Sequence, residues 1–210
     1  MEHEEEQLER IREWWQKNGK AVILGVIAAI IAAVSVQSWM VNQRAHTETA
    51  SAEYAQLLQY IDNDQAKAAG VADRIISDYD DTIYATMAAL LQARLAVEKS
   101  DWDKAAASLS WAMENSDDDG LRHVARLRLA RVLMQQDKTD AALALLVDVE
   151  QGAFSANYQE LLGDIYLLKG DKDKARAAYA KAVVMSTAGG NNRLLQMKLD
   201  DLAVESKETK

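Results

Sequence analysis

The chain has 210 residues, no cysteine, no proline and a formal net charge of −9 at pH 7. This acidic balance argues against a nucleic-acid partner and against docking on anionic lipid through a basic patch, because both need clustered Lys and Arg. The lack of cysteine excludes disulfides, thiol catalysis, Cys-ligated zinc and iron–sulfur clusters.

Residues 21–41 form an uncharged run long enough to cross a membrane. The sequence AVILGVIAAIIAAVSVQSWMV makes a helix about 32 Å long at about 1.5 Å per residue, close to the thickness of a bilayer's hydrocarbon core. Trp14 and Trp15 precede the run and Trp39 lies near its end. Because tryptophan prefers the membrane–water boundaries, we expect a transmembrane helix at 21–41 after an acidic segment at 1–20.

The basic residues around this run predict its orientation. Arg10, Arg12, Lys17 and Lys20 precede it, and only Arg44 occurs in the 20 residues that follow. Lys and Arg accumulate on the cytoplasmic side of a membrane. We therefore expect the N-terminus in the cytoplasm and everything after residue 41 outside it.

A cleaved signal peptide is the alternative, with Ala33-Val34-Ser35 as a weak candidate cleavage site. Signal peptides have a basic start and an apolar core of about 7–15 residues. Here the leader is net negative and the apolar run is longer, so an uncleaved anchor is favoured.

Small residues recur along one face of the expected membrane helix. Gly25, Ala29 and Ala33 are four apart, and such stripes let another membrane helix approach closely. Ala28 and Ala32 form a second row, so the abundance of alanine explains the pattern equally well. Both interpretations, helix packing and composition, remain open.

An internal repeat organises residues 42–203. Three six-residue turns align, each with Asp fourth and Ala sixth, at spacings of 37 and 33 residues. A helix–turn–helix unit that recurs about every 34 residues is typical of tetratricopeptide repeats. The turns are Ser100–Ala105, Asp137–Ala142 and Gly170–Ala175. The sequence thus predicts an all-α protein, a tetratricopeptide-like α-solenoid of three to four repeats.

Apolar periodicity gives the expected helices of this domain. Those before the three turns are Ile83–Glu98, Leu121–Gln136 and Ala156–Leu168, and those after them are Lys104–Asn115, Ala141–Val149 and Lys174–Met185. A helix pair within residues 50–79, interrupted at Asp62–Asp64, is expected to be a degenerate fourth repeat. After a loop at 186–192, a helix over Arg193–Ala203 should cap the stack, and residues 204–210 should be a disordered tail.

Residues of the kind that carry chemistry are sparse. His3, His46 and His123 have no second candidate ligand at helical spacing, so surface or structural roles are favoured. Asp117–Gly120 lacks the spacing of a calcium loop, and Gly189–Asn192 is expected to be an ordinary turn. No nucleotide-binding or hydrolase motif occurs. We expect no catalytic residues, cofactor or metal.

A binding surface is what remains. In tetratricopeptide stacks the first helix of each repeat lines a concave groove, and two consecutive repeats would present apolar side chains and one arginine each. Such a groove suits an apolar helix or extended segment, unless the chain's own helices at 50–61 or 193–203 fill it. The expected groove residues are Met87, Leu90, Arg94, Val97, Val124, Leu127, Arg131 and Met134.

Three stretches together resemble a known family. They are the leader ending WWQKNGK, the segment ARLAVEKSDWDKAAASL with its successor LRLARV, and the closing helix LLQMKLDDL. In order and length the chain is similar to the ancillary SecYEG translocon subunits, or YfgM-like proteins, of proteobacteria. It lacks the tryptophan and the closing proline of the tetratricopeptide motif, which leaves the repeat boundaries open.

The resemblance implies a non-enzymatic inner-membrane protein with one span and a periplasmic tetratricopeptide-like domain. It also implies association with the SecYEG channel and with the membrane-anchored periplasmic chaperone PpiD, in support of newly secreted proteins. A structural organiser of a cell-envelope or division complex is the alternative, because many anchored helical repeats serve that purpose. An enzyme is the third and least favoured class.

Overall fold

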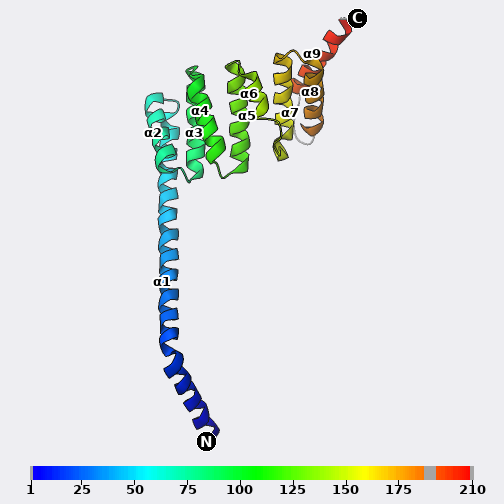
Figure 1. Cartoon of the computed structure of the whole chain (residues 1–210). Helices are drawn as coiled ribbons and strands as arrows, with labels where there is room; N and C mark the ends of the chain where they lie inside the picture. The colour runs from blue at the N-terminus through cyan, green and yellow to red at the C-terminus, as the bar shows by residue number, and fades with distance from the viewer. Residues whose placement is uncertain (1, 187–192, 209–210) are drawn as a thin grey trace. The chain divides into compact units, whose positions relative to one another are not determined.

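The structure, a computed structural model, describes residues 2–186 and 193–208, which are helices joined by short turns. The chain divides into two compact units, residues 1–49 and residues 50–210. Within the second unit, helices that follow one another in the sequence pack side by side (Figure 1). A long apolar helix followed by tetratricopeptide-like repeats agrees with the predicted fold class.

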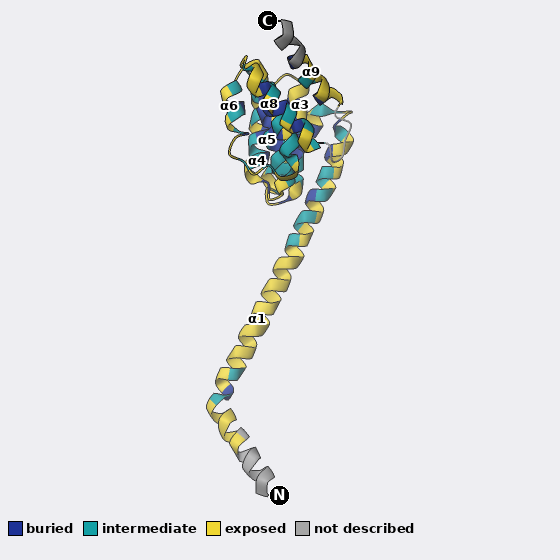
Figure 2. Ribbon diagram, turned by 90° about the vertical axis from the view of Figure 1, so that its right-hand side faces the viewer, coloured by how far each residue is buried: buried dark blue, intermediate teal, exposed yellow. Residues whose placement is uncertain are grey.

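The first helix, α1, spans Glu2–Tyr60 without a break. Its apolar residues lie on the outside: Leu24 is 67% exposed and Ile31 is 61% exposed, and Figure 2 shows the same exposure along most of its length. The helix is long and apolar enough to cross a membrane. Exposed apolar side chains all around a helix are typical of a segment that water does not surround. The side chains of the acidic cluster, Glu2–Glu9, lie outside the described residues.

The second unit begins with the last turns of α1 and continues as a series of antiparallel helices. Its later helices are α2 (Gln65–Asp78), α3 (Ile83–Glu98), α4 (Trp102–Asn115), α5 (Asp119–Gln135), α6 (Thr139–Ala144), the 3-10 helix η1 (Gly152–Phe154), α7 (Ser155–Leu168), α8 (Lys172–Ser186) and α9 (Arg193–Glu208).

Most of these bounds agree with the prediction. The helix α3 begins and ends where expected, and α4 and α8 begin slightly earlier. The early start of α4 follows from its cap, since the Asp101 carboxylate accepts a hydrogen bond from the Lys104 amide at 3.1 Å. The backbone of α9 is helical beyond Ala203, to Glu208, in a stretch without glycine or proline. The expected turn at 189–192 lies outside the described residues.

The three aligned turns share one backbone geometry. Ser100, Asp137 and Gly170 each begin a turn, and their φ angles are 59°, 60° and 77°. In each turn the next amide donates to a carbonyl five residues earlier, for example Asp101 to Ala96 at 2.8 Å. This left-handed residue with its back-bonded amide is a Schellman helix end. The sequence repeat is therefore a repeat of structure.

The second helix of the middle repeat is shorter than predicted. The prediction of a helix over Ala141–Val149 was wrong in length, because the observed helix α6 ends at Ala144. Val147 and Val149 disfavour helix through their branched side chains, and Asp148 between them takes a left-handed φ of 57°. The chain then crosses to η1 in an irregular connection.

Neighbouring helices approach each other at small residues. Ala105 and Ala112 of α4 and Ala125 of α5 are fully buried in one cluster with Leu109. Between α7 and α8 the smallest residue is needed, because a Cβ atom on Gly163 would overlap the Tyr179 ring. The predicted small/large pattern of the last repeat thus has a direct steric cause.

A polar network joins α9 to α7 and α8. The Lys198 ammonium donates to Glu160 at 2.9 Å and to Asp164 at 2.8 Å, and the Tyr179 hydroxyl also donates to Asp164 at 2.8 Å. Burial would lower the pKa of Lys198, but its hydrogen bonds to Asp164 and Glu160 outweigh burial and raise it. Burial and the bond to Asp164 raise the pKa of Tyr179 strongly. Leu195 adds apolar contact beneath this network.

The replacement Gly163→Ala is expected to destabilise the domain by about 1–3 kcal/mol, because the added methyl group overpacks the α7–α8 contact. The matched control is Gly70→Ala in α2, where a Cβ meets no atom within 4 Å; it should stabilise by about 0.5–1 kcal/mol. Urea unfolding followed by circular dichroism measures both. Equal effects of the two variants would contradict the steric explanation.

Alkaline pH is expected to weaken the α9 network. Both raised pKa values mean that the folded state binds its protons more tightly than the unfolded state, whose values are near 10.5 for Lys198 and 10.0 for Tyr179. Their contribution is therefore complete below about pH 10 and is lost as the pH rises through the folded values. Unfolding free energies at about pH 9 and about pH 11 should differ less in a Lys198→Gln/Tyr179→Phe variant than in the parent.

Candidate functional site

A groove opens between α3 and α5, with α4 as its floor. It has a volume of about 530 Å³, and we call it the α3–α5 groove. The helices α3 and α5 are the first helices of two consecutive repeats. In a tetratricopeptide stack these first helices line the concave side. Its lining residues are Leu90, Ala93, Arg94, Val97, Glu98, Trp102, Leu109, Arg128, Arg131, Val132 and Gln135.

The floor of the groove is apolar and firmly packed. Leu109 is 2% exposed and Val132 is 6% exposed, and both belong to the cluster that holds α3, α4 and α5 together. Val97 stands at the rim and is 38% exposed. Trp102, the first residue of α4, packs partly buried against the same cluster. A ligand would therefore meet an apolar surface that the domain itself keeps rigid.

Three arginines stand around this floor. Arg94 donates a hydrogen bond to Glu98 at 2.8 Å, and this bond raises the pKa of Arg94 above its ordinary value. The Arg94 guanidinium group also lies 3.5 Å from the Asp62 carboxylate. In contrast, no ion pair or hydrogen bond joins the guanidinium group of Arg128 or Arg131 to any other residue that the structure describes. The rim thus carries two uncompensated positive charges.

The structure brings together half of the predicted groove residues. Leu90, Arg94, Val97 and Arg131 all line the α3–α5 groove. Their helical spacing places them on the faces of α3 and α5 that border this groove.

The other predicted residues lie elsewhere. Leu127 and Met134 pack toward α7, in the cluster around Tyr158. Val124 packs partly buried against the cluster beneath the groove, and Met87 is partly exposed on α3 without lining it. The helix α5 is a shared wall with one side toward α3 and the other toward α7, and the apolar pattern alone does not separate the two sides.

The chain's own helices do not occupy the groove in the part of the chain that is described. The end of α1 packs through Leu57 against α2 and α3, and α9 packs through Leu195 against α8. The lining residues come from α3, α4 and α5 alone. The end of α1 and the helix α9 therefore do not fill the groove, which was the alternative that the sequence left open.

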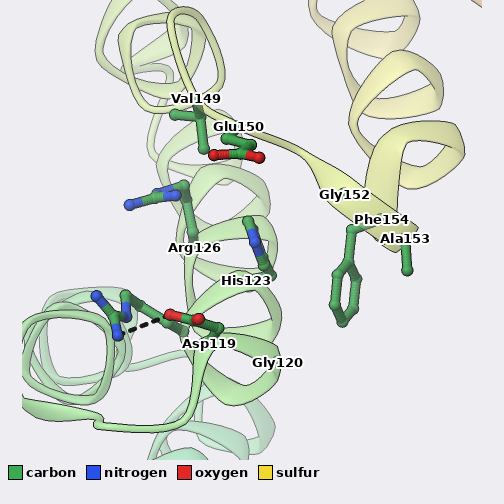
Figure 3. Close-up of a pocket in the computed structure, with 10 residues that line it drawn as sticks. Asp119, Gly120, His123, Arg126, Val149, Glu150, Gly152, Ala153 and Phe154 are labelled. Carbon is green, nitrogen blue, oxygen red and sulfur yellow. Dashed lines mark ion pairs between the residues drawn. The ribbon is translucent and has the colours of Figure 1, made fainter.

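A second hollow lies on the other side of α5, where the shortened α6 gives way to η1. We call it the polar pocket; its volume is about 540 Å³. Figure 3 shows His123 between Arg126 and Phe154, with Glu150 above them. The pocket is lined by Asp119, Gly120, Arg122, His123, Arg126, Val149, Glu150, Gly152, Ala153 and Phe154.

His123 is held in place by its neighbours in this pocket. Its Nδ1 lies 2.8 Å from the hydroxyl oxygen of the buried Tyr158, and its ring lies 5.0 Å from that of Phe154. The Arg126 guanidinium contacts the same hydroxyl at 3.5 Å. The sequence favoured a structural or surface role for His123, and the link to a residue 35 positions away has no sequence signal.

The side chains that line these two hollows are suited to binding a partner. Within residues 10–186 and 193–202, no group of three or more His, Cys, Asp or Glu side chains is placed to hold a metal ion. The groove offers apolar surface and positive charge, and the polar pocket offers a mixture of charges of both signs. In the first unit, the stripe residues Gly25, Ala29 and Ala33 are exposed on α1.

Comparison with known sequences identifies the family. Residues 12–204 match a family described as a tetratricopeptide repeat-like domain. The ancillary SecYEG translocon subunit of Aggregatibacter actinomycetemcomitans is 36% identical over 200 residues, 95% of this chain and 97% of that protein. Proteins of the same name from Haemophilus influenzae and Escherichia coli are 32% and 30% identical, and the matches cover 95% and 97% of this chain and 97% and 98% of theirs.

Solved structures support the fold. BtubC from P. vanneervenii has a TM-score of 0.58 at 17% identity, over 78% of this chain and 84% of that one. A tetratricopeptide repeat protein from Parabacteroides merdae has a TM-score of 0.50 at 20% identity, over 73% of this chain and 57% of that one. With the helical repeats, the exposed apolar helix and this full-length similarity, the chain belongs to the ancillary SecYEG translocon subunit family, which is non-enzymatic.

Proposed function

We propose that this protein is a single-pass inner-membrane adaptor that associates with the SecYEG translocon and with a membrane-anchored periplasmic chaperone of the PpiD kind. In this role it assists secreted proteins after they leave the channel. The observation that carries the proposal is the similarity along nearly the whole chain to proteins named as translocon subunits. The chaperone partnership rests on the family resemblance.

The anchor is argued from α1. Trp15 and Trp39 are 51% and 67% exposed, and 24 residues of helix separate them by about 36 Å, which spans a hydrocarbon core and its two boundaries. Ser35 within this stretch donates to the Ile31 carbonyl at 2.8 Å, so its hydroxyl group is satisfied without water. A span over residues 21–41 accounts for these features, and the excess of Lys and Arg before it favours a repeat domain in the periplasm.

Two surfaces serve the adaptor in this proposal. The stripe of Gly25, Ala29 and Ala33 packs against a partner's membrane helix, where small residues allow close contact. The α3–α5 groove, with Leu90, Val97 and their neighbours, docks a segment of a periplasmic partner. The contact in the membrane and the contact in the groove together hold the protein at the channel.

The orientation is tested with a reporter that is active only in the cytoplasm. Fused after Lys210 it should be inactive, and fused ahead of Met1 in the same chain it should be active, because four basic residues hold the N-terminal side in the cytoplasm. Activity after Lys210 would reverse the proposed topology.

The partnership is tested by photo-crosslinking in living cells. A crosslinking residue at position 29 is expected to capture the translocon or the chaperone more efficiently than one at position 31. The two positions point about 200° apart on the helix, so Ile31 is a matched control on the opposite face. If neither position recovers either partner, the adaptor role is wrong. Equal recovery would contradict only the choice of face, and capture of division or envelope proteins would support the structural organiser instead.

A further inference from the structure

The helix α5 is basic in a chain that is otherwise acidic. The part of the chain after residue 41 carries 20 Lys and Arg against 27 Asp and Glu. In α5, however, the charged side chains are four arginines and one aspartate: Asp119, Arg122, Arg126, Arg128 and Arg131. Arg122 is paired with Asp119 at 2.9 Å. The arginines that face the α3–α5 groove have no such partner.

Several other cations of this domain stand beside carboxylates: Arg74 donates to Glu53 at 2.7 Å, and Lys174 to Asp171 at 2.7 Å. Arg128 and Arg131, three residues apart on one helix face, instead stand close to each other, and like charges at this spacing repel. A ligand that supplied carboxylates would relieve the repulsion and form charge-assisted hydrogen bonds.

The floor beside these arginines adds a second requirement. Leu90, Leu109 and Val132 are almost fully buried, yet they line an open groove together with Trp102. An apolar side chain that enters here removes further apolar surface from water, which favours binding. A soluble anion without apolar groups would leave the apolar floor of the groove in contact with water.

We propose that the α3–α5 groove binds polypeptide segments in which apolar side chains are flanked by Asp or Glu. The apolar side chains occupy the floor, and the carboxylates pair with Arg128 and Arg131. Arg94, already satisfied by Glu98, borders the site without contributing a free charge. The inference rests on the proposed function only for the groove's role as a docking surface, and it gives the chemistry of the partner.

The test is a binding assay with the purified full-length protein in detergent micelles. Three fluorescein-labelled octapeptides serve as probes: acidic and apolar (ELLDELLE), basic and apolar (KLLKKLLK), and acidic and polar (ESSDESSE). Fluorescence anisotropy should show the first probe binding about tenfold or more tightly than the other two, because only it satisfies both the rim and the floor. Equal affinities for the three, or tighter binding of the basic probe, would overturn the proposal.

Variants locate the interaction. Arg131→Glu should lower the affinity of the acidic, apolar probe about tenfold, and Arg128→Glu/Arg131→Glu should reverse the preference in favour of the basic probe. The matched control is Lys181→Glu, an equal change of charge at an exposed position of α8. If Lys181→Glu weakens binding as much as Arg131→Glu does, overall charge explains the result and the groove does not.

A change in an apolar side chain that lines the groove completes the test. Val97→Ser alters a rim residue that is 38% exposed, so the fold tolerates it, and the affinity of the acidic, apolar probe should fall about threefold or more. Unchanged affinity would contradict the apolar contact. These readouts use peptides and purified protein alone, so they can fail while crosslinking still recovers the translocon, and the reverse also holds.

Discussion

Close contact between helices at alanine and glycine is the constraint on which the repeat domain depends. Ala105, Ala112 and Ala125 are completely buried, and Gly163 gives the Tyr179 ring the space it occupies. Because each hairpin has only two short helices, a single hairpin buries too little apolar surface to be stable alone, and stability comes from stacking. Short helices can therefore form a long, regular scaffold without disulfides or metals.

This mode of packing also explains where a binding surface can form. Larger side chains fill the spaces between hairpins, whereas the concave side is lined by whatever the first helix of each repeat presents to solvent. In α5 that face presents Arg128 and Arg131 above Val132. The same helix turns His123 and Arg126 toward η1 and the connection that leads to it, so one helix borders two hollows of different chemistry. The break after Ala144 creates the second hollow and the stacking creates the first.

Much of this architecture could be predicted from the sequence. The turns at Ser100, Asp137 and Gly170 were recognisable because each has Asp at its fourth position and Ala at its sixth, and the flanking apolar periodicity predicted the helices. The length of α6 was missed, because Leu145–Val149 continues an apolar period that its branched residues and Asp148 do not support as helix.

The groove was predicted in part, for a geometric reason. Leu90, Arg94 and Val97 follow from the spacing on α3, but Trp102 enters from the start of α4, and Arg128 depends on how far α5 is rotated. The contact between His123 and Tyr158 joins two repeats. Such contacts depend on distances between helices, and the period of one helix contains no information about them.

Attachment to a membrane changes what such a groove needs to achieve. In the proposed role, a partner held at the same channel would meet the groove at a high effective concentration, so weak contacts would suffice and release would remain fast. An acidic domain surface is repelled by anionic lipid, which keeps the domain free to find protein partners. Two arginines on an apolar floor then select among them by charge, since electrostatic complementarity contributes more to specificity and encounter rate than to tight binding. In the proposed adaptor role the protein would bind a partner briefly and release it, and modest, selective contacts suit that role better than a deep, tight site.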